Sequence, residues 1–290
     1  MSRYLSVIVL YYALGVVLGP IFGCHGQGLS LDASLHHAKQ SALNHGSEDL
    51  NFEGVSEGQI LSVGYLTDSS GSTICTATLL DERRALTAGH CLDGLHPTEV
   101  SFGLGPDPSA PLVQIPVQTA HLNEALDVGL LIVGRPASEF VPELDWMAVE
   151  TQPLENPVGL VAGVVAYGQD LSGPQRRGFS RVHIDEVTAE FFEVTPLNGA
   201  GYCGGDSGSP LISTLDFDEP GRIIAIHQQG MSDCSGAGLE RQMHTATQWL
   251  ATVMTQDLPP ELAPCSVEQV DTNWCQEEHM MSWCSEGWVQ

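Results

Sequence analysis

The chain has 290 residues, with 36 acidic and 10 basic side chains, so its formal charge is −26 at pH 7. A surface this negative repels phosphate backbones and anionic headgroups, and no cluster of Lys and Arg offsets it, which argues against nucleic-acid binding. Apolar residues make up 42% and charged residues 16%, which is typical of a folded chain. A chain of this length buries enough surface to fold without metal ions, and it predicts two domains or one large β protein.

The first residues predict export. Arg3 precedes the almost wholly apolar run Val7–Gly23, the pattern of a secretory signal peptide, which we place at residues 1–26. A transmembrane anchor is the alternative, but an apolar run of about 17 residues, interrupted by glycines and a proline, is marginal for a span. A second alternative rests on Ile21–Cys24, which resembles a bacterial lipoprotein box in which Cys24 is acylated and anchors the chain to a membrane.

The cysteines agree with a secreted, extracellular protein. There are eight, and cysteines in an exported chain indicate disulfide bonds. No CxxC motif is present, so the sequence does not support a zinc ribbon or a thioredoxin-like site. We therefore expect disulfides and neither metal nor organic cofactor.

Residues 27–54 are polar and are interpreted as a leader or pro-segment, after which short runs of β-forming residues follow one another. Turn residues separate them, as at 81–83 and 219–221, so an antiparallel barrel or sandwich is expected. The runs are Ile60–Leu66, Ile74–Leu80, Arg84–Ala88, Val128–Val133, Val161–Tyr167, Arg181–Val187, Phe191–Val194, Pro210–Ser213 and Ile223–His227.

The end of the chain differs in character. Met243–Met254 is the one segment with helical periodicity, with Trp249, Leu250 and Val253 on one face. Residues 256–290 then form an acidic extension that contains three tryptophans and three cysteines. We interpret it as a structural extension rather than a module that binds a partner or the cell surface.

Three segments carry chemistry. Leu86–Cys91 (LTAGHC) places His90 at the end of a strand, Asp127–Ile132 (DVGLLI) starts a strand with a carboxylate, and Cys203–Pro210 (CGGDSGSP) is a glycine-rich loop around Ser207. A serine hydroxyl attacks carbonyl carbon only when a base takes its proton, and histidine is that base near neutral pH. The imidazole needs a carboxylate to fix its tautomer, so the three segments together predict a catalytic triad.

These segments resemble the trypsin/chymotrypsin family of serine endopeptidases over residues 55–255. The resemblance implies an all-β fold of two six-stranded antiparallel barrels, joined near residues 136–158 and followed by a C-terminal helix. It implies that His90 is the general base, Asp127 its orienter and Ser207 the nucleophile. Gly205 and Ser207 then donate the oxyanion-hole N–H groups.

The same resemblance pairs four cysteines. It matches Cys75 with Cys91, behind the histidine, and Cys203 with Cys234, beside the specificity pocket. The first bridge closes a loop of 15 residues, worth roughly 3 kcal/mol in the chain-entropy model. The partners of the remaining cysteines stay open: Cys24, Cys265, Cys275 and Cys284.

Activation departs from the family pattern. Family zymogens are cut to expose an Ile-Val-Gly-Gly-like terminus that pairs with the aspartate before the serine, here Asp206. No such tetrapeptide lies at the expected distance upstream, since 55–58 is too close to the first strand. Asp206 is therefore expected to pair otherwise.

The specificity pocket also departs from the trypsins. The resemblance places Gly201 where trypsins carry the aspartate that binds Arg or Lys, followed by Tyr202, so a trypsin-like preference is disfavoured. His227 falls where glutamate-specific relatives carry a substrate-binding histidine, and an imidazole donor can bind a carboxylate. The alternative is a strand histidine with an internal hydrogen bond. Gly230 and Gly238 complete the predicted pocket.

Two other carboxylates compete for the triad. Asp93 follows His90 too closely in the chain, and Asp145 does not begin an apolar strand, so Asp127 is preferred. The predicted function is a secreted serine endopeptidase acting on proteins or peptides. The alternative is a non-catalytic homologue that binds proteins outside the cell or at its surface.

Overall fold

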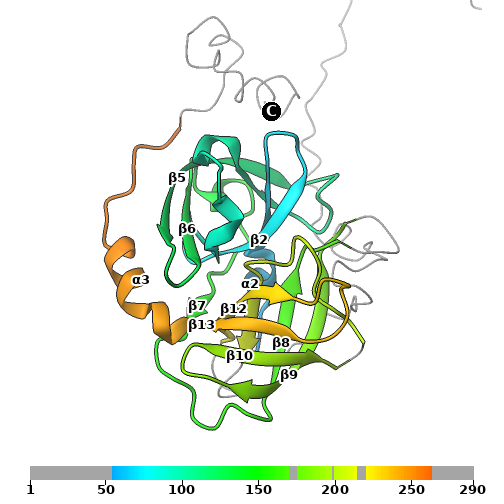
Figure 1. Cartoon of the computed structure of the whole chain (residues 1–290). Coiled ribbons are helices and arrows are strands. Elements are labelled where there is room, and N and C mark those ends of the chain that lie inside the picture. The colour runs from blue at the N-terminus through cyan, green and yellow to red at the C-terminus, as the bar shows by residue number, and fades with distance from the viewer. Residues whose placement is uncertain (1–53, 170–174, 198, 214–219, 263–290) are drawn as a thin grey trace, which may run out of the picture.

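The computed structural model describes residues 54–169, 175–197, 199–213 and 220–262, which form two β-barrels and a short C-terminal helix (Figure 1). The predicted all-β, two-barrel fold is confirmed. The predicted signal peptide (1–26), the leader up to residue 53 and the extension from residue 263 lie outside the described residues, and with them Cys24, Cys265, Cys275 and Cys284. Within the described ranges, no helix is long and apolar enough to cross a membrane.

Six antiparallel strands close the first barrel, in the order β1-β2-β3-β6-β5-β4. Asp81 makes the turn between β2 and β3, because its carboxylate accepts the backbone N–H groups of Arg83 and Arg84 at 2.9 and 2.8 Å. The strands are β1 (Val63–Thr67), β2 (Thr73–Leu79), β3 (Arg84–Ala88), β4 (Ser101–Leu104), β5 (Val113–Asn123) and β6 (Val128–Val133).

The second barrel follows the order β11-β8-β9-β10-β13-β12 and closes through the β11–β12 pair. A two-residue strand in the connection between the barrels, β7 (Ala148–Val149), adds to β12 in parallel. The predicted turn at 219–221 falls partly outside the described residues. The strands are β8 (Val161–Ala166), β9 (Gly178–Val187), β10 (Phe191–Pro196), β11 (Pro210–Ser213), β12 (Arg222–Gly230) and β13 (Gly238–Gln242).

The first predicted strand is partly wrong. Residues 60 and 61 belong to a short helix, α2 (Glu57–Leu61), and β1 begins only at Val63. Ser56 and Gln59 form a capping box that starts this helix, and local capping here prevails over the β-propensity of the apolar residues that follow. Besides the two-residue β7, three strands were missed, β4, β5 and β13, because their polar residues, proline or glycine hide the alternation.

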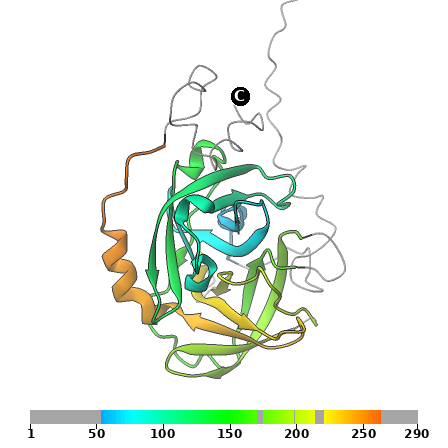
Figure 2. The same cartoon turned by 45° about the horizontal axis from the view of Figure 1, so that its top comes forward.

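The predicted C-terminal helix is confirmed as η4 (Met243–Ala246), a 3₁₀ turn, followed by α3 (Thr247–Met254). Other 3₁₀ turns are η1 (Gly89–Leu92), η2 (Pro97–Glu99) and η3 (Ala137–Glu139). The chain then runs back along the first barrel (Figure 2). Arg83 donates to the carbonyl of Pro259 at 2.9 Å, and Leu262 N–H donates to Gly134 O at 2.8 Å. The start of the extension is therefore tied to the first barrel.

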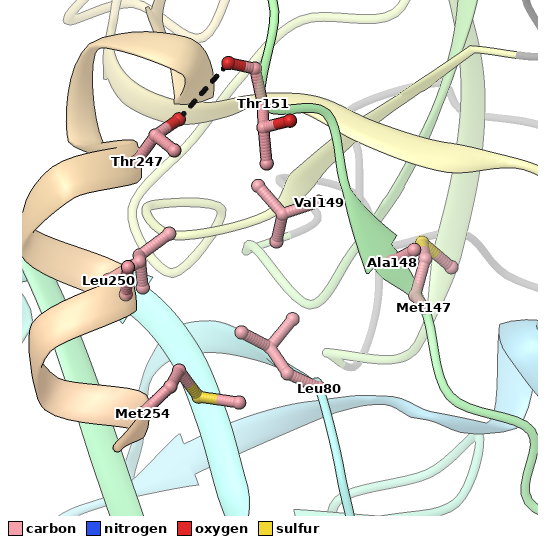
Figure 3. A pocket seen from close by; sticks show the side chains of 9 residues that line it. Leu80, Met147, Ala148, Val149, Thr151, Thr247, Leu250 and Met254 are labelled. Carbon is pink, nitrogen blue, oxygen red and sulfur yellow. Dashed lines mark hydrogen bonds between the residues drawn. The ribbon is translucent and has the colours of Figure 1, made fainter. Parts of the chain in front are cut away.

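The hydrophobic core has three parts. One fills each barrel, and the third lies between the barrels and under α3, where Tyr65, Leu130 and Ile226 meet. An apolar groove of about 300 Å³ remains open between α3 and β7, lined by residues such as Leu80, Val149 and Leu250 (Figure 3). It lies on the outer side of the interbarrel core and contains none of the residues predicted to act in catalysis.

Candidate active site

The first contact of the predicted site joins His90 to Asp127. Asp127 Oδ2 lies 2.8 Å from His90 Nδ1, and Asp127 Oδ1 accepts the backbone N–H of His90 at 2.7 Å. One carboxylate therefore holds both the ring and the backbone of the histidine, which fixes the ring orientation and places the Nδ1 proton toward the carboxylate.

Strand pairing explains why these two residues meet. β3 and β6 pair antiparallel with Ala88 opposite Val128, so the residues that follow β3 lie beside the residue that precedes β6. Asp127 has a φ of 53°, a left-handed conformation that is uncommon for a residue other than glycine. Gln228 of the second barrel braces this turn, because its amide donates to the carbonyls of Leu126 and Asp127 at 3.0 and 2.7 Å.

Ser207 lies in a tight turn that ends at β11. Asp206 N–H donates to Cys203 O at 3.1 Å, and Ser209 N–H donates to Asp206 O at 2.9 Å. Gly205 and Gly208 have φ values of 99° and 82°, a region that residues with a Cβ rarely adopt. The glycines are what allow the chain to turn this sharply around the serine.

The serine turn packs directly against the first barrel through Thr76 of β2. Thr76 N–H donates to Ser207 O at 2.8 Å, and its hydroxyl donates to Gly205 O at 2.9 Å. A Cβ on Gly208 would lie 2.3 Å from Thr76 O and 2.9 Å from Ala88 N. The serine turn therefore lies against the end of β3, the strand that leads to His90.

Both predicted disulfides are confirmed. Cys75–Cys91 links β2 to the residue after His90, and Cys203–Cys234 links the start of the serine turn to the loop after β12. The sulfur atoms of Cys75 and Cys91 lie near the His90 ring, but both are oxidised in the bridge and neither is a thiolate ligand for a metal.

The contact between His90 and Asp127 shifts the pKa of both residues. The hydrogen bond to Asp127 raises the pKa of His90 above its usual 6.5, although partial burial opposes this. Burial alone would raise the pKa of Asp127, but the hydrogen bonds from His90 outweigh it and the pKa of Asp127 falls below its usual value. Asp127 is therefore ionised and His90 titrates somewhat above an exposed histidine.

The carboxyl group of Asp206 has hydrogen-bond partners other than a new amino terminus. Its fully buried carboxyl group accepts the backbone N–H groups of Gly168 at 2.7 Å and Cys203 at 2.8 Å. Burial raises the pKa of Asp206 to about 7. Because the folded pKa exceeds the unfolded one, this group favours the folded state most below pH of about 4 and loses that effect as pH rises through 7.

The segment upstream of β1, residues 54–59, packs against the start of β12. Gly221 N–H donates to Gly54 O at 2.8 Å, and the Gln59 amide donates to Gly221 O at 3.0 Å. Residues 54–59 are thus held against the start of β12, and the two backbone N–H groups that Asp206 accepts come from Gly168 and Cys203 instead.

The predicted pocket residues lie together beside the serine turn. Gly208 N–H donates to His227 O, and His227 N–H donates to Ser209 O, at 2.8 and 2.9 Å. Gly230 and Gly238 are paired across β12 and β13. A Cβ on Gly201 would lie 2.0 Å from Cys234 O, so this position admits only glycine.

Asp93 and Asp145, the two alternative carboxylates for the triad, lie at other positions in the fold. Asp145 accepts from the Ser56 hydroxyl at 3.1 Å, and Asp93 follows η1. Sequence reasoning missed Thr76, Gln228 and Glu240, which brace the site. Thr76 follows Cys75 and Gln228 follows His227, but neither residue type signals such a role without the fold.

A family model described as Trypsin matches residues 54–250, which is more than half of the chain. No curated protein matches the sequence.

We predict that Asp127→Asn lowers the pKa of His90, because a neutral amide cannot stabilise the imidazolium as the carboxylate does. NMR titration of the His90 ring measures this. Asp93→Asn is the matched control, since Asp93 contributes only a weaker through-space charge. A larger shift from Asp93→Asn than from Asp127→Asn would contradict the assignment of Asp127 as the partner.

We predict that Gly208→Ala destabilises the fold more than Gly71→Ala. Both glycines have a φ near 80°, so each substitution costs about 1–2 kcal/mol of backbone strain. Only at Gly208 does the new Cβ clash, which adds about 1–3 kcal/mol of overpacking. Urea unfolding of the two variants measures the difference, and equal losses would refute the close packing of the serine turn on β2.

Proposed function

Because the chain belongs to the trypsin family of serine proteases, we propose that it is a secreted serine endopeptidase that hydrolyses peptide bonds through an acyl-enzyme intermediate. The observation that carries the proposal is the double contact of Asp127 with the ring and backbone of His90, beside the glycine-rich turn of Ser207. Its substrates are proteins or peptides.

In the proposed mechanism, His90 removes the proton of the Ser207 hydroxyl as the oxygen attacks the carbonyl carbon of the scissile bond. Asp127 keeps the Nδ1 proton of His90 in place, so that Nε2 is the basic nitrogen, and it stabilises the imidazolium that forms. His90 then gives this proton to the departing amine. Water attacks the acyl-enzyme in the second half, with His90 again as the base.

The N–H groups of Gly205 and Ser207 are assigned to the oxyanion of the tetrahedral intermediate. The Gly205 carbonyl accepts from the Thr76 hydroxyl and the amide of Asp206 donates within the turn, which holds the neighbouring peptide planes. Losing one such donor typically lowers the rate by roughly 10²–10³-fold.

The second candidate is a non-catalytic homologue that binds proteins, and the missing activation terminus favours it. Against it stands the Asp206 carboxyl group, which is satisfied by two backbone N–H groups without any new terminus. We propose that the serine turn holds its shape through these two bonds and needs no activating cut.

Secretion is proposed from the signal-like residues 1–26 and agrees with the two disulfides, which persist in oxidising compartments. A lipoprotein anchored at Cys24 is the alternative. Mass spectrometry of the first residue of the mature protein distinguishes the two, because acylation adds the mass of the lipid at Cys24.

We predict that a fluorophosphonate probe labels the secreted protein at Ser207, because the His90–Asp127 pair activates this hydroxyl. Ser207→Ala and His90→Ala abolish labelling, whereas Ser109→Ala, at an exposed turn serine, keeps it. Mass spectrometry of the labelled peptide locates the adduct. A wild-type protein that stays unlabelled, even after limited proteolysis of the leader, would favour the protein-binding homologue.

We predict that kcat/KM rises with pH through a single pKa above 6.5. Only neutral His90 accepts the serine proton, and the bond to Asp127 raises the pH at which that form appears. Asp127→Asn lowers the plateau strongly. Rates of peptide hydrolysis between pH 5 and 9 measure this, and a flat profile from pH 5 to 8 would rule out His90 as the base.

A further inference from the structure

A tyrosine occupies the predicted specificity pocket. Tyr202 lies five residues before Ser207, and only 1% of its surface is exposed. The pocket walls are the end of β12 and the start of β13, where Gly230 pairs with Gly238. Because this pocket opens beside the proposed nucleophile, whatever fills it limits the substrate side chain that precedes the scissile bond.

The two glycines make room for Tyr202 rather than for a ligand. A Cβ on Gly230 would lie 2.7 Å from the Cβ of Tyr202, and a Cβ on Gly238 would lie 2.5 Å from the edge of its ring. Real Cβ atoms do not approach this closely. The side chain of Tyr202 therefore packs across both glycines on one face of the strand pair, and a large substrate side chain would have to share that space.

The ring of Tyr202 also covers His227. The two rings stack with centroids 3.8 Å apart and planes 7° apart. His227 Nδ1 lies 2.9 Å from a carboxylate oxygen of Glu240, and the side chains of His227 and Glu240 are 2% and 1% exposed. His227 thus already has a carboxylate partner inside the protein and presents no open ring face to a substrate.

The Tyr202 ring is difficult to displace from this position. Moving the Tyr202 ring outward would expose the His227–Glu240 pair to water and break a stacked contact in a close-packed interior. The ring would also leave an unfilled volume over Gly230 and Gly238. A substrate side chain would have to compensate for all of these losses before it could enter.

We propose that Tyr202 determines the substrate preference by filling the pocket, so that the protease accepts only small residues, glycine, alanine or serine, before the scissile bond. The inference rests on the proposed endopeptidase function and assigns its substrate class. It gives Tyr202 the specificity role that the sequence offered to His227, and it makes His227 and Glu240 the buried support of the tyrosine.

The test measures kcat/KM of the secreted protein on peptides that differ only at the residue before the scissile bond, per active site titrated with the fluorophosphonate probe. Wild type cleaves after alanine at least about 100-fold faster than after phenylalanine, arginine or glutamate, since a single methylene that does not fit a hydrophobic pocket already costs about 10–200-fold and these side chains are larger by several groups. Tyr202→Ala raises cleavage after phenylalanine at least about 10-fold relative to alanine. Tyr202→Phe keeps the wild-type pattern, because it retains the ring.

In the cleavage assay, two results overturn the proposal. One is efficient wild-type cleavage after phenylalanine, leucine or arginine; the other is a preference for glutamate that His227→Ala removes. If Tyr202→Ala folds poorly, as shown by a reduced active-site titre, Tyr202→Leu takes its place and shifts the preference in the same direction.

A binding measurement separates this inference from the catalytic proposal. Indole should raise the melting temperature of Ser207→Ala/Tyr202→Ala more than that of Ser207→Ala alone, because both keep the groove between α3 and β7 but only the former also opens an apolar pocket beside the serine turn. Equal binding to both variants, or to neither, refutes the filled pocket whether or not the chain is an enzyme. Absence of probe labelling at Ser207 would refute the catalytic proposal alone.

Discussion

Thr76 carries the contact on which the arrangement of the site depends. It is fully buried at the junction of the two barrels, and its backbone N–H and hydroxyl both donate to the serine turn. Its hydroxyl also accepts the backbone N–H of Tyr167 at 3.0 Å, and its carbonyl accepts from the Thr87 hydroxyl at 2.8 Å. One residue thus links β2, β3, the residue after β8 and the serine turn, and an unmade bond here would leave a buried polar group without a partner.

The disulfides and the buried carboxyl group of Asp206 act around this contact. Cys75–Cys91 ties the residue before Thr76 to the residue after His90, so the position of the histidine is coupled to that of the serine turn. Asp206 holds the other side of the turn through the N–H groups of Gly168 and Cys203. Burying that carboxyl group costs stability near neutral pH, and the two hydrogen bonds offset part of the cost.

Beside the serine turn, the buried polar groups are likewise neutral or paired with one another. Burial, and next the nearby charge of Glu240, raise the pKa of Tyr202 well above its usual value, so the tyrosine is neutral. His227 and Glu240 satisfy each other beneath it. In the proposed specificity pocket, the ring of Tyr202 therefore rests on a buried histidine that is paired with a glutamate inside the protein.

The sequence alone determined the β-rich fold class and the order His90, Asp127, Ser207, because short β-forming runs and glycine-rich loops are local patterns, whereas the two barrels and the two disulfide pairs came from the resemblance to the trypsin family. It predicted β6 and β11 at their observed bounds, where continuous apolar residues are unambiguous. It misassigned residues 60 and 61, since an apolar pair suits helix and strand alike, and it missed β5, where polar residues break the pattern. Only the tertiary structure decided that Asp127 contacts both the ring and the backbone of His90, that Asp206 uses backbone donors and that Tyr202 covers His227. Each of these is a contact between residues distant in the chain or across a strand pair, and its geometry depends on register, twist and packing that no local pattern encodes.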